Sequence, residues 1–194
     1  MSVYPSAQFL LSAANPAQFP ADGGAEVAIA GRSNAGKSSA INAITARHAL
    51  ARTSKMPGRT RLLNFFELSP GRRLVDLPGY GFAEGAPTER DSWAQLIDAL
   101  APRECLKGLL LVVDARRGLL PGDLQLLAWA EGIERPVHVL LSKADQLKRA
   151  EARTLLARCQ AQLAGRASVQ LFSAHEGLGL DEARGTIDAW LRAA

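Results

Sequence analysis

Residues 31–38, GRSNAGKS, fit the pattern G-x-x-x-x-G-K-[ST] and lie between an apolar run at 27–30 and a helical pattern at 37–47. The glycines let backbone N–H groups turn inward around phosphate oxygens, and the start of the helix adds positive potential. Lys37 is expected to reach the β- and γ-phosphates, and the Ser38 hydroxyl to ligate Mg²⁺. A glycine-rich turn without a ligand is the alternative, but the complete match with the required flanks favours a phosphate site.

A second motif, DLPG at residues 76–79, follows a short apolar strand pattern. Taken alone, Asp76 is equally well explained as a cap on a turn. Together with a phosphate loop, however, it becomes the acid that holds Mg²⁺ through water. The backbone N–H of Gly79 is then placed to sense the γ-phosphate.

A third motif, SKAD at residues 142–145, follows the apolar run 137–141 and is similar to the guanine-reading pattern N/T-K-x-D. The Asp145 carboxylate would accept two hydrogen bonds from guanine N1–H and its 2-amino group, a donor pair that adenine lacks. Lys143 would lay its aliphatic stem along the purine ring. Residues 173–174, after the next strand pattern, are placed to offer a backbone N–H to guanine O6. Taken singly, KAD at a helix end is usually a solvated cap, and Ser173-Ala174 carries almost no information.

The stretch 47–61 is basic and contains no acidic residue. Its Pro57-Gly58 pair predicts a loop, and Thr60 within it is expected to cover Mg²⁺ and the γ-phosphate, so that loss of this phosphate releases the loop. A solvated loop explains the charges equally well. The basic residues are Arg47, Arg52, Lys55, Arg59 and Arg61.

These motifs define the candidate site. The residues expected to contact nucleotide are Gly31, Arg32, Ser33, Asn34, Ala35, Gly36, Lys37, Ser38, Ser39, Asp76, Leu77, Pro78, Gly79, Ser142, Lys143, Ala144, Asp145, Ser173 and Ala174. The residues expected to act in catalysis are Lys37, Thr60 and Gly79, with Ser38 and Thr60 as Mg²⁺ ligands.

The elements that must position these residues alternate between short apolar strands and amphipathic helices. Strand patterns at 27–30, 62–68, 74–75, 109–113, 137–141 and 169–172 are interleaved with helical patterns at 37–47, 92–100, from 121, 150–163 and 180–191. Such alternation predicts a three-layer α/β fold on a mostly parallel sheet, here of six strands with one antiparallel edge strand. Ligands bind beyond the carboxyl ends of strands in such sheets, where the motifs fall.

Composition excludes several other classes of protein. The chain has 194 residues, 47% of them hydrophobic and 22% charged, and its two cysteines do not suit a disulfide framework. No apolar run approaches the ~18 residues of a membrane span. We expect a cytoplasmic protein with one globular domain at 25–194 and an extension at 1–24 packed on it. The formal charge of +4 is too small to identify a nucleic-acid partner.

At this point the chain resembles the translational-type P-loop GTPases, and closely the EngB family of ribosome-biogenesis GTP-binding proteins. The matching segments are GRSNAGKSS at 31–39, PGRT at 57–60, NFF at 64–66, VDLPGYGF at 75–82, DAR at 114–116 with Gly118, SKAD at 142–145 and FLLSA at 9–13. The resemblance covers nearly the whole chain. The chain departs from the usual family residues at Ala35 (Val), Arg61 (Gln) and Ser142 (Thr).

The resemblance implies a P-loop GTPase domain that binds GTP and GDP with Mg²⁺ and assists assembly of the large ribosomal subunit, a role linked to bacterial growth and division. Its expected partner is the precursor of that subunit, both rRNA and ribosomal protein. We expect a monomer that binds neither membrane nor DNA. The alternative is a P-loop enzyme of another class, such as a small-molecule kinase, against which the guanine motif argues.

Two expectations concern hydrolysis. Tyr80 follows Gly79 where switch GTPases often carry a water-orienting Gln, so the intrinsic rate should be near the ~10⁻⁴–10⁻³ s⁻¹ of an unassisted switch. Related GTPases use an Asn at the position of Asn34 to ligate K⁺. Support of the loop by hydrogen bonds alone is the equally weighted alternative for Asn34.

Overall fold

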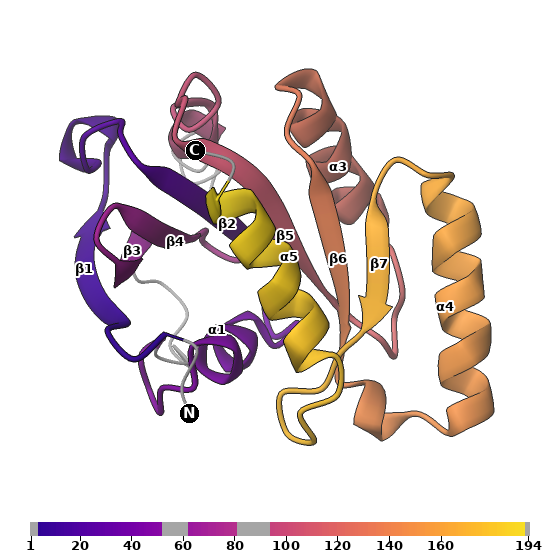
Figure 1. The fold of residues 1–194 in the computed structure, drawn as a ribbon. Helices are drawn as coiled ribbons and strands as arrows, with labels where there is room; N and C mark the ends of the chain where they lie inside the picture. The colour runs from indigo at the N-terminus through magenta and orange to yellow at the C-terminus, as the bar shows by residue number, and fades with distance from the viewer. Residues whose placement is uncertain (1–3, 52–61, 81–93, 193–194) are drawn as a thin grey trace.

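The computed structural model describes residues 4–51, 62–80 and 94–192 (Figure 1). The strands are β1 (Gln8–Ala13), β2 (Ala25–Gly31), β3 (Leu63–Ser69), β4 (Arg72–Asp76), β5 (Leu106–Asp114), β6 (Val137–Ser142) and β7 (Ser168–Leu171). The α-helices are α1 (Lys37–Thr45), α3 (Pro121–Gly132), α4 (Arg149–Leu163) and α5 (Leu180–Arg192), and residues 94–98 are also helical. Two 3-10 turns are η1 (Pro16–Gln18) and η2 (Ala144–Gln146).

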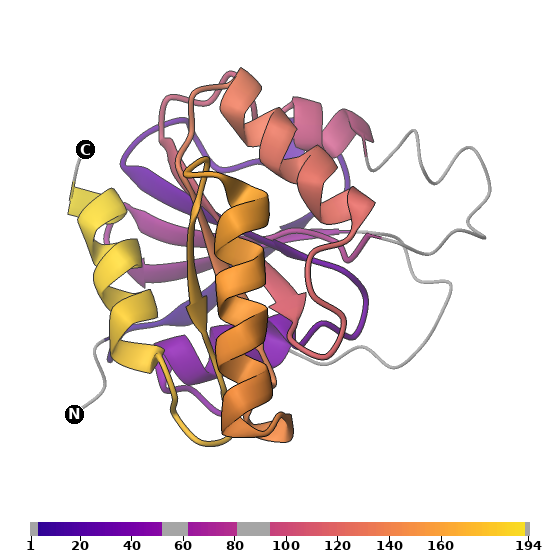
Figure 2. The ribbon, with the colours of Figure 1, turned by 90° about the vertical axis from the view of Figure 1, so that its right-hand side faces the viewer.

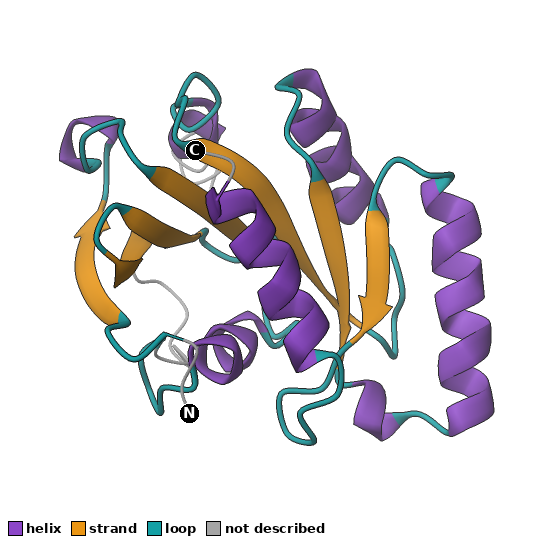
Figure 3. Cartoon of the chain, in the orientation of Figure 1, coloured by secondary structure: helices purple, strands orange, loops and turns teal. Residues whose placement is uncertain are grey.

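The strands form one sheet in the order β1-β3-β4-β2-β5-β6-β7, with helices on both faces (Figures 2 and 3). Strands β4, β2, β5, β6 and β7 pair in parallel, whereas β3 is antiparallel to both its neighbours. The central strand β2 is buried along its whole length and β5 along nearly all of it. Continuous apolar runs are required here because both sheet faces are covered. The predicted α/β fold is therefore confirmed.

The sheet has seven strands in the described residues rather than the predicted six. The antiparallel strand β3 is not at an edge, because β1 lies outside it. Strand β1 comes from the N-terminal stretch and pairs with β3, from Gln8 opposite Glu67 to Ala13 opposite Leu63. The sequence pattern missed it because an edge strand needs few buried residues: only Ala13 of β1 is fully buried, and a bulge interrupts the pairing.

Two apolar cores fill the space between the layers. One lies between the sheet and α3, α4 and the helical residues 94–98, and the other between the sheet and α1 and α5. The first includes Leu127 and Cys159, and the second Ile41 and Ile187, all at most 1% exposed. The helices are thus fixed against the strands whose ends carry the candidate site.

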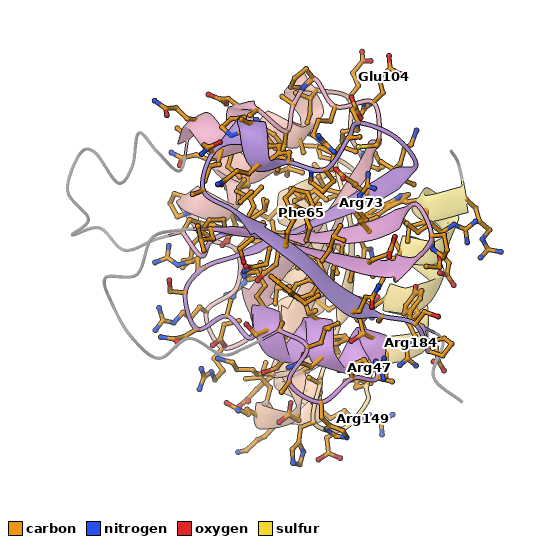
Figure 4. All side chains as sticks on the ribbon, turned by 90° about the vertical axis from the view of Figure 1, so that its left-hand side faces the viewer. Arg47, Phe65, Arg73, Glu104, Arg149 and Arg184 are labelled. Atoms are coloured by element: carbon orange, nitrogen blue, oxygen red, sulfur yellow. The ribbon has the colours of Figure 1, made fainter. Side chains whose placement is uncertain are left out.

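The connection from β1 to β2 is held by a buried ion cluster on β2. Glu26 is fully buried and accepts from Arg73 Nε at 2.8 Å and from Arg103 at 2.9 and 3.0 Å. Both arginines, of which Arg73 is labelled in Figure 4, also donate to backbone carbonyls of residues 20–23. Removing the carboxylate would leave two buried charges unpaired. The cluster therefore ties the N-terminal stretch to the sheet.

Among the described residues there is no helix with both the length and the apolar character that a membrane crossing requires.

Candidate functional site

The candidate site lies at the carboxyl ends of the parallel strands. The phosphate loop follows β2, Asp76 is the last residue of β4, and Ser142 is the last residue of β6. Residues 173–174 follow β7. Because neighbouring parallel strands have their carboxyl ends on the same side of the sheet, motifs more than 100 residues apart in the chain meet here.

The phosphate loop takes the left-handed backbone conformation at two positions, one of them a glycine. Asn34 and Gly36 have positive φ angles of 64° and 97°. A Cβ on Gly31 would lie 2.7 Å from the Val112 carbonyl oxygen, so only glycine fits against β5. The loop is also tied to the segment after β4, since Ser33 N donates to Tyr80 O at 3.1 Å. This turn leads directly into α1, the arrangement that binds phosphate in P-loop proteins.

Lys37 and Asp76 face each other at the ends of the loop and of β4. Lys37 Nζ donates to Asp76 Oδ1, and both side chains are only 10–12% exposed. Asn64, which pairs with Asp76 across β3 and β4, donates its amide to the other carboxylate oxygen at 3.4 Å. Ser38 is the second residue of α1. A hydroxyl and a carboxylate are oxygen donors of the kind Mg²⁺ takes, so these residues fit the expected ion.

Gly79 lies against the phosphate loop. A Cβ at this position would be 3.0 Å from Ser33 Oγ and 3.3 Å from the Ser33 backbone, so the close approach suits glycine. Leu77, by contrast, is fully buried in the core, and its N–H donates to Ile29 O at 2.9 Å. The DLPG segment therefore runs alongside the loop, with Gly79 as its point of contact.

The guanine motif is attached to the phosphate loop by two side chains. The buried Ser142 hydroxyl donates to Ala35 O and lies 3.1 Å from Val113 O. Lys143, with a φ of 60°, donates from Nζ to Asn34 O at 2.6 Å. The structure therefore joins the first and third motifs, the phosphate loop and SKAD, through direct contacts.

A cavity of about 660 Å³ opens between this motif and α1. Gly36 and Ser39 line one side of it, and Lys143, Asp145 and Ala174 line the other. Ser173 is fully buried; its hydroxyl accepts from Glu176 N at 3.1 Å and shapes the loop after β7. The cavity has the lining expected for a purine: an exposed carboxylate, a lysine stem and a loop backbone.

Several contacts of the site were not predicted from the sequence. Asn64 supports Asp76, and Asp114 at the end of β5 accepts from Lys143 Nζ at 2.9 Å. Tyr80 donates its hydroxyl to the buried Asp123 at the start of α3. Burial and the nearby Asp123 carboxylate raise the pKa of Tyr80, so the hydroxyl stays protonated. Asn64 and Asp114 lie in the family-matching segments NFF at 64–66 and DAR at 114–116, but these segments do not indicate which residues the two side chains contact.

Thr60 and most of the basic stretch 47–61 lie outside the described residues, as does the segment that follows Tyr80. The expectation that Thr60 covers Mg²⁺ and the γ-phosphate therefore stays a prediction.

The Ser142→Ala variant is expected to bind GDP about 5-fold more weakly, because one hydrogen bond of about 1 kcal/mol between β6 and the phosphate loop is lost. Ser142→Thr keeps the hydroxyl and its hydrogen bond to the loop, so its affinity for GDP should stay within about 2-fold of wild type. Titration with a fluorescent GDP analogue measures both. Equal affinity of the Ala variant and wild type would show that the hydroxyl does not hold the loop in its binding conformation.

Comparison with known proteins agrees with this geometry. Residues 26–143 match a family model described as 50S ribosome-binding GTPase. A probable GTP-binding protein EngB of Coxiella burnetii is 46% identical over 193 residues, covering 97% of this chain and 94% of that protein. The protein of the same name from Stenotrophomonas maltophilia is 48% identical over 190 residues, covering 95% of each.

Solved structures agree at the level of the fold. A crystal structure of a probable GTP-binding protein EngB superposes with a TM-score of 0.70 at 23% identity, covering 88% of this chain and all of that one. A single-residue variant of Aquifex aeolicus Era bound to GDP and AlF4⁻ superposes with a TM-score of 0.65 at 21% identity, covering 87% of this chain and 57% of that one. With near-full-length identity of 46–48% to the two relatives and a phosphate loop joined to a guanine motif, the chain belongs to the EngB family of GTP-binding proteins and is a GTPase.

Proposed function

We propose that this GTPase is a nucleotide-gated assembly factor for the large ribosomal subunit, acting in the cytoplasm as a monomer. The observation that carries the proposal is the match of residues 26–143 to the family described as 50S ribosome-binding GTPase. The partner is the precursor of the large subunit, both rRNA and ribosomal protein. The stretch 47–61, which has five basic residues and no acidic one in its sequence, suits contact with RNA phosphates.

The residues of the chain have separate tasks in this proposal. The backbone N–H groups of residues 31–37 and the Lys37 ammonium bind the phosphates of GTP. Ser38, Thr60 and, through water, Asp76 would hold Mg²⁺, which would neutralise phosphate charge. The ion pair between Lys37 and Asp76 supports this assignment, because it brings the proposed phosphate-binding lysine next to the proposed magnesium acid. Gly79 is the contact through which the γ-phosphate acts on the segment beyond residue 80.

We predict slow hydrolysis by the purified protein, near ~10⁻⁴–10⁻³ s⁻¹. Tyr80 stands at the position of a water-orienting Gln, and its hydroxyl is committed to Asp123. A single-turnover assay with GTP and Mg²⁺, in which free phosphate is followed, measures the rate. Rapid turnover without any partner would refute this expectation; acceleration by ribosomal particles would support it.

The role of Asn34 is tested by the choice of salt. We propose that its side chain would ligate K⁺, and that the cation would supply positive charge to the phosphates. Asn34 is exposed in the phosphate loop, and its own carbonyl is held by Lys143. Hydrolysis faster in KCl than in NaCl, with and without ribosomal particles, is the expected result. Equal rates would leave Asn34 with a structural role alone.

Co-sedimentation with isolated ribosomal subunits tests the assembly role. We expect binding to the large subunit in one nucleotide state, compared between a non-hydrolysable GTP analogue and GDP. Absence from both subunits in both states would refute the proposal. The kinase alternative is separated by competition, because a guanine-specific site should not exchange bound GDP for ATP.

A further inference from the structure

The carboxylate of Asp114, at the end of β5, connects two parts of the nucleotide site. Lys143 Nζ donates to its Oδ2 at 2.9 Å and to Asn34 O in the phosphate loop at 2.6 Å. Asp114 is opposite Ser142 in the β5–β6 register, so Lys143 follows directly beside it. The guanine-reading lysine is therefore held at its ammonium by one charged and one backbone acceptor.

Arg116 fixes the orientation of that carboxylate. Its Nε donates to Asp114 Oδ1 at 2.9 Å and its NH2 group to Oδ2 at 2.6 Å, a side-on bidentate pair. Its backbone N–H also donates to Oδ1 at 3.0 Å. The turn that makes this possible is local: the Asp114 carbonyl accepts from the N–H groups of Arg117 and Gly118, and Gly118 has a φ of 69°.

The charges favour a fixed arrangement. The Asp114 side chain is 8% exposed, whereas those of Lys143 and Arg116 are 25% and 48% exposed. Burial raises the pKa of the Asp114 carboxyl, but hydrogen bonds from Arg116 and Lys143 outweigh it and hold the pKa well below its usual range. The carboxylate thus stays charged at any pH at which the protein would act.

We propose that Asp114 and Arg116 are positioning residues that hold Lys143 against the phosphate loop and thereby set how slowly guanine nucleotide leaves the site. The inference rests on guanine-nucleotide binding at residues 142–145. The Lys143 stem must lie flat along the purine while its ammonium bridges to the phosphate loop. A lysine has many rotamers, and without the Asp114 carboxylate the bridging one would lose its charged anchor.

The dissociation rate of a fluorescent GDP analogue, measured by stopped-flow displacement with excess GDP, tests the proposal. Asp114→Asn keeps the size of the side chain but removes its charge, and dissociation should accelerate about 10-fold, the effect of one charge-assisted hydrogen bond. Arg116→Ala should accelerate it about 3-fold, a smaller effect because the residue 116 backbone N–H still holds the carboxylate. Arg117→Ala, which removes the same charge one residue later, is the matched control and should leave the rate unchanged.

A double-mutant cycle separates positioning from a general effect on folding. Lys143→Met keeps an unbranched apolar stem but has no ammonium, so adding Asp114→Asn to it should change the dissociation rate by less than about 2-fold. An unchanged rate in Asp114→Asn, or an equal acceleration with and without the Lys143 ammonium, would overturn the inference. If the wild-type protein does not bind GDP, the assignment of a guanine site at residues 142–145, on which this inference rests, is wrong. Arg116→Ala, a surface change, keeps the test open if Asp114→Asn does not fold.

Discussion

The Lys37→Ala variant is expected to hydrolyse GTP at least about 100-fold more slowly than wild type, the size typical of removing one preorganised charge from a phosphoryl-transfer site. Lys37 is the first residue of α1, and its ammonium lies at the point where the phosphate loop faces Asp76. The substitution removes the charge expected to contact the β- and γ-phosphates. Among the described residues, it leaves the Asp76 carboxylate with the Asn64 amide as its side-chain partner. Single-turnover hydrolysis and GDP affinity measure the effect.

Two further variants make the result for Lys37 specific. Lys37→Arg keeps the positive charge but replaces a compact ammonium with a planar fork, and should not restore activity. Lys148→Ala removes an exposed lysine before α4, remote from the loop in sequence, and should match wild type. Circular dichroism confirms that each variant is folded. Activity of Lys37→Ala within about 10-fold of wild type would contradict the assigned role, given the expected scale.

The Asp145→Asn variant should change which base is bound. Guanine offers two donors, N1–H and the 2-amino group, and a carboxylate accepts from both. The Asn amide oxygen can accept from only one of these two guanine donors. Its NH₂ group would face the second donor without forming a hydrogen bond. Two hydrogen bonds to a charged group are disrupted, so GTP affinity should fall by about 100-fold or more. Xanthine carries a carbonyl at position 2, which the amide can donate to, and XTP affinity should therefore rise.

Competition against a fluorescent GDP analogue by GTP, XTP and ATP measures this change in specificity. Asp181→Asn, at an exposed carboxylate in the first turn of α5, is the matched control and should leave the order of the three nucleotides unchanged. If Asp145→Asn binds GTP as wild type does, the cavity between Lys143 and Ala174 is not the guanine pocket. If it weakens GTP without favouring XTP, Asp145 contributes to binding but does not select the base.

Most elements could be predicted from the sequence because their signals are local. The run at 109–113 is apolar throughout, as a strand covered on both faces must be, and it lies within β5. Strand β1 was missed because an edge strand buries little. Because β1 was not predicted, the antiparallel β3 was expected to be the edge strand.

In the candidate site too, features that are contiguous in sequence could be predicted and contacts between distant residues could not. The phosphate loop and the SKAD motif are contiguous, and their chemistry depends on residue types at fixed spacing, so residues 31–38 and 142–145 could be read directly. The contacts of Asp76 with Asn64 and of Asp114 with Lys143 join residues 12 and 29 positions apart. No spacing rule links such pairs; they follow from strand register.

The sequence alone therefore predicted the kinds of chemistry: a phosphate-binding loop, a carboxylate that would hold Mg²⁺ and a guanine-binding motif, each at the end of a strand. Only the tertiary structure decided how these parts support one another. Parallel pairing places Asp114 opposite Ser142, and antiparallel pairing places Asn64 opposite Asp76. The physical reason is that hydrogen bonds and ion pairs act over about 3 Å, a proximity that chain order does not specify and the register of a folded sheet does.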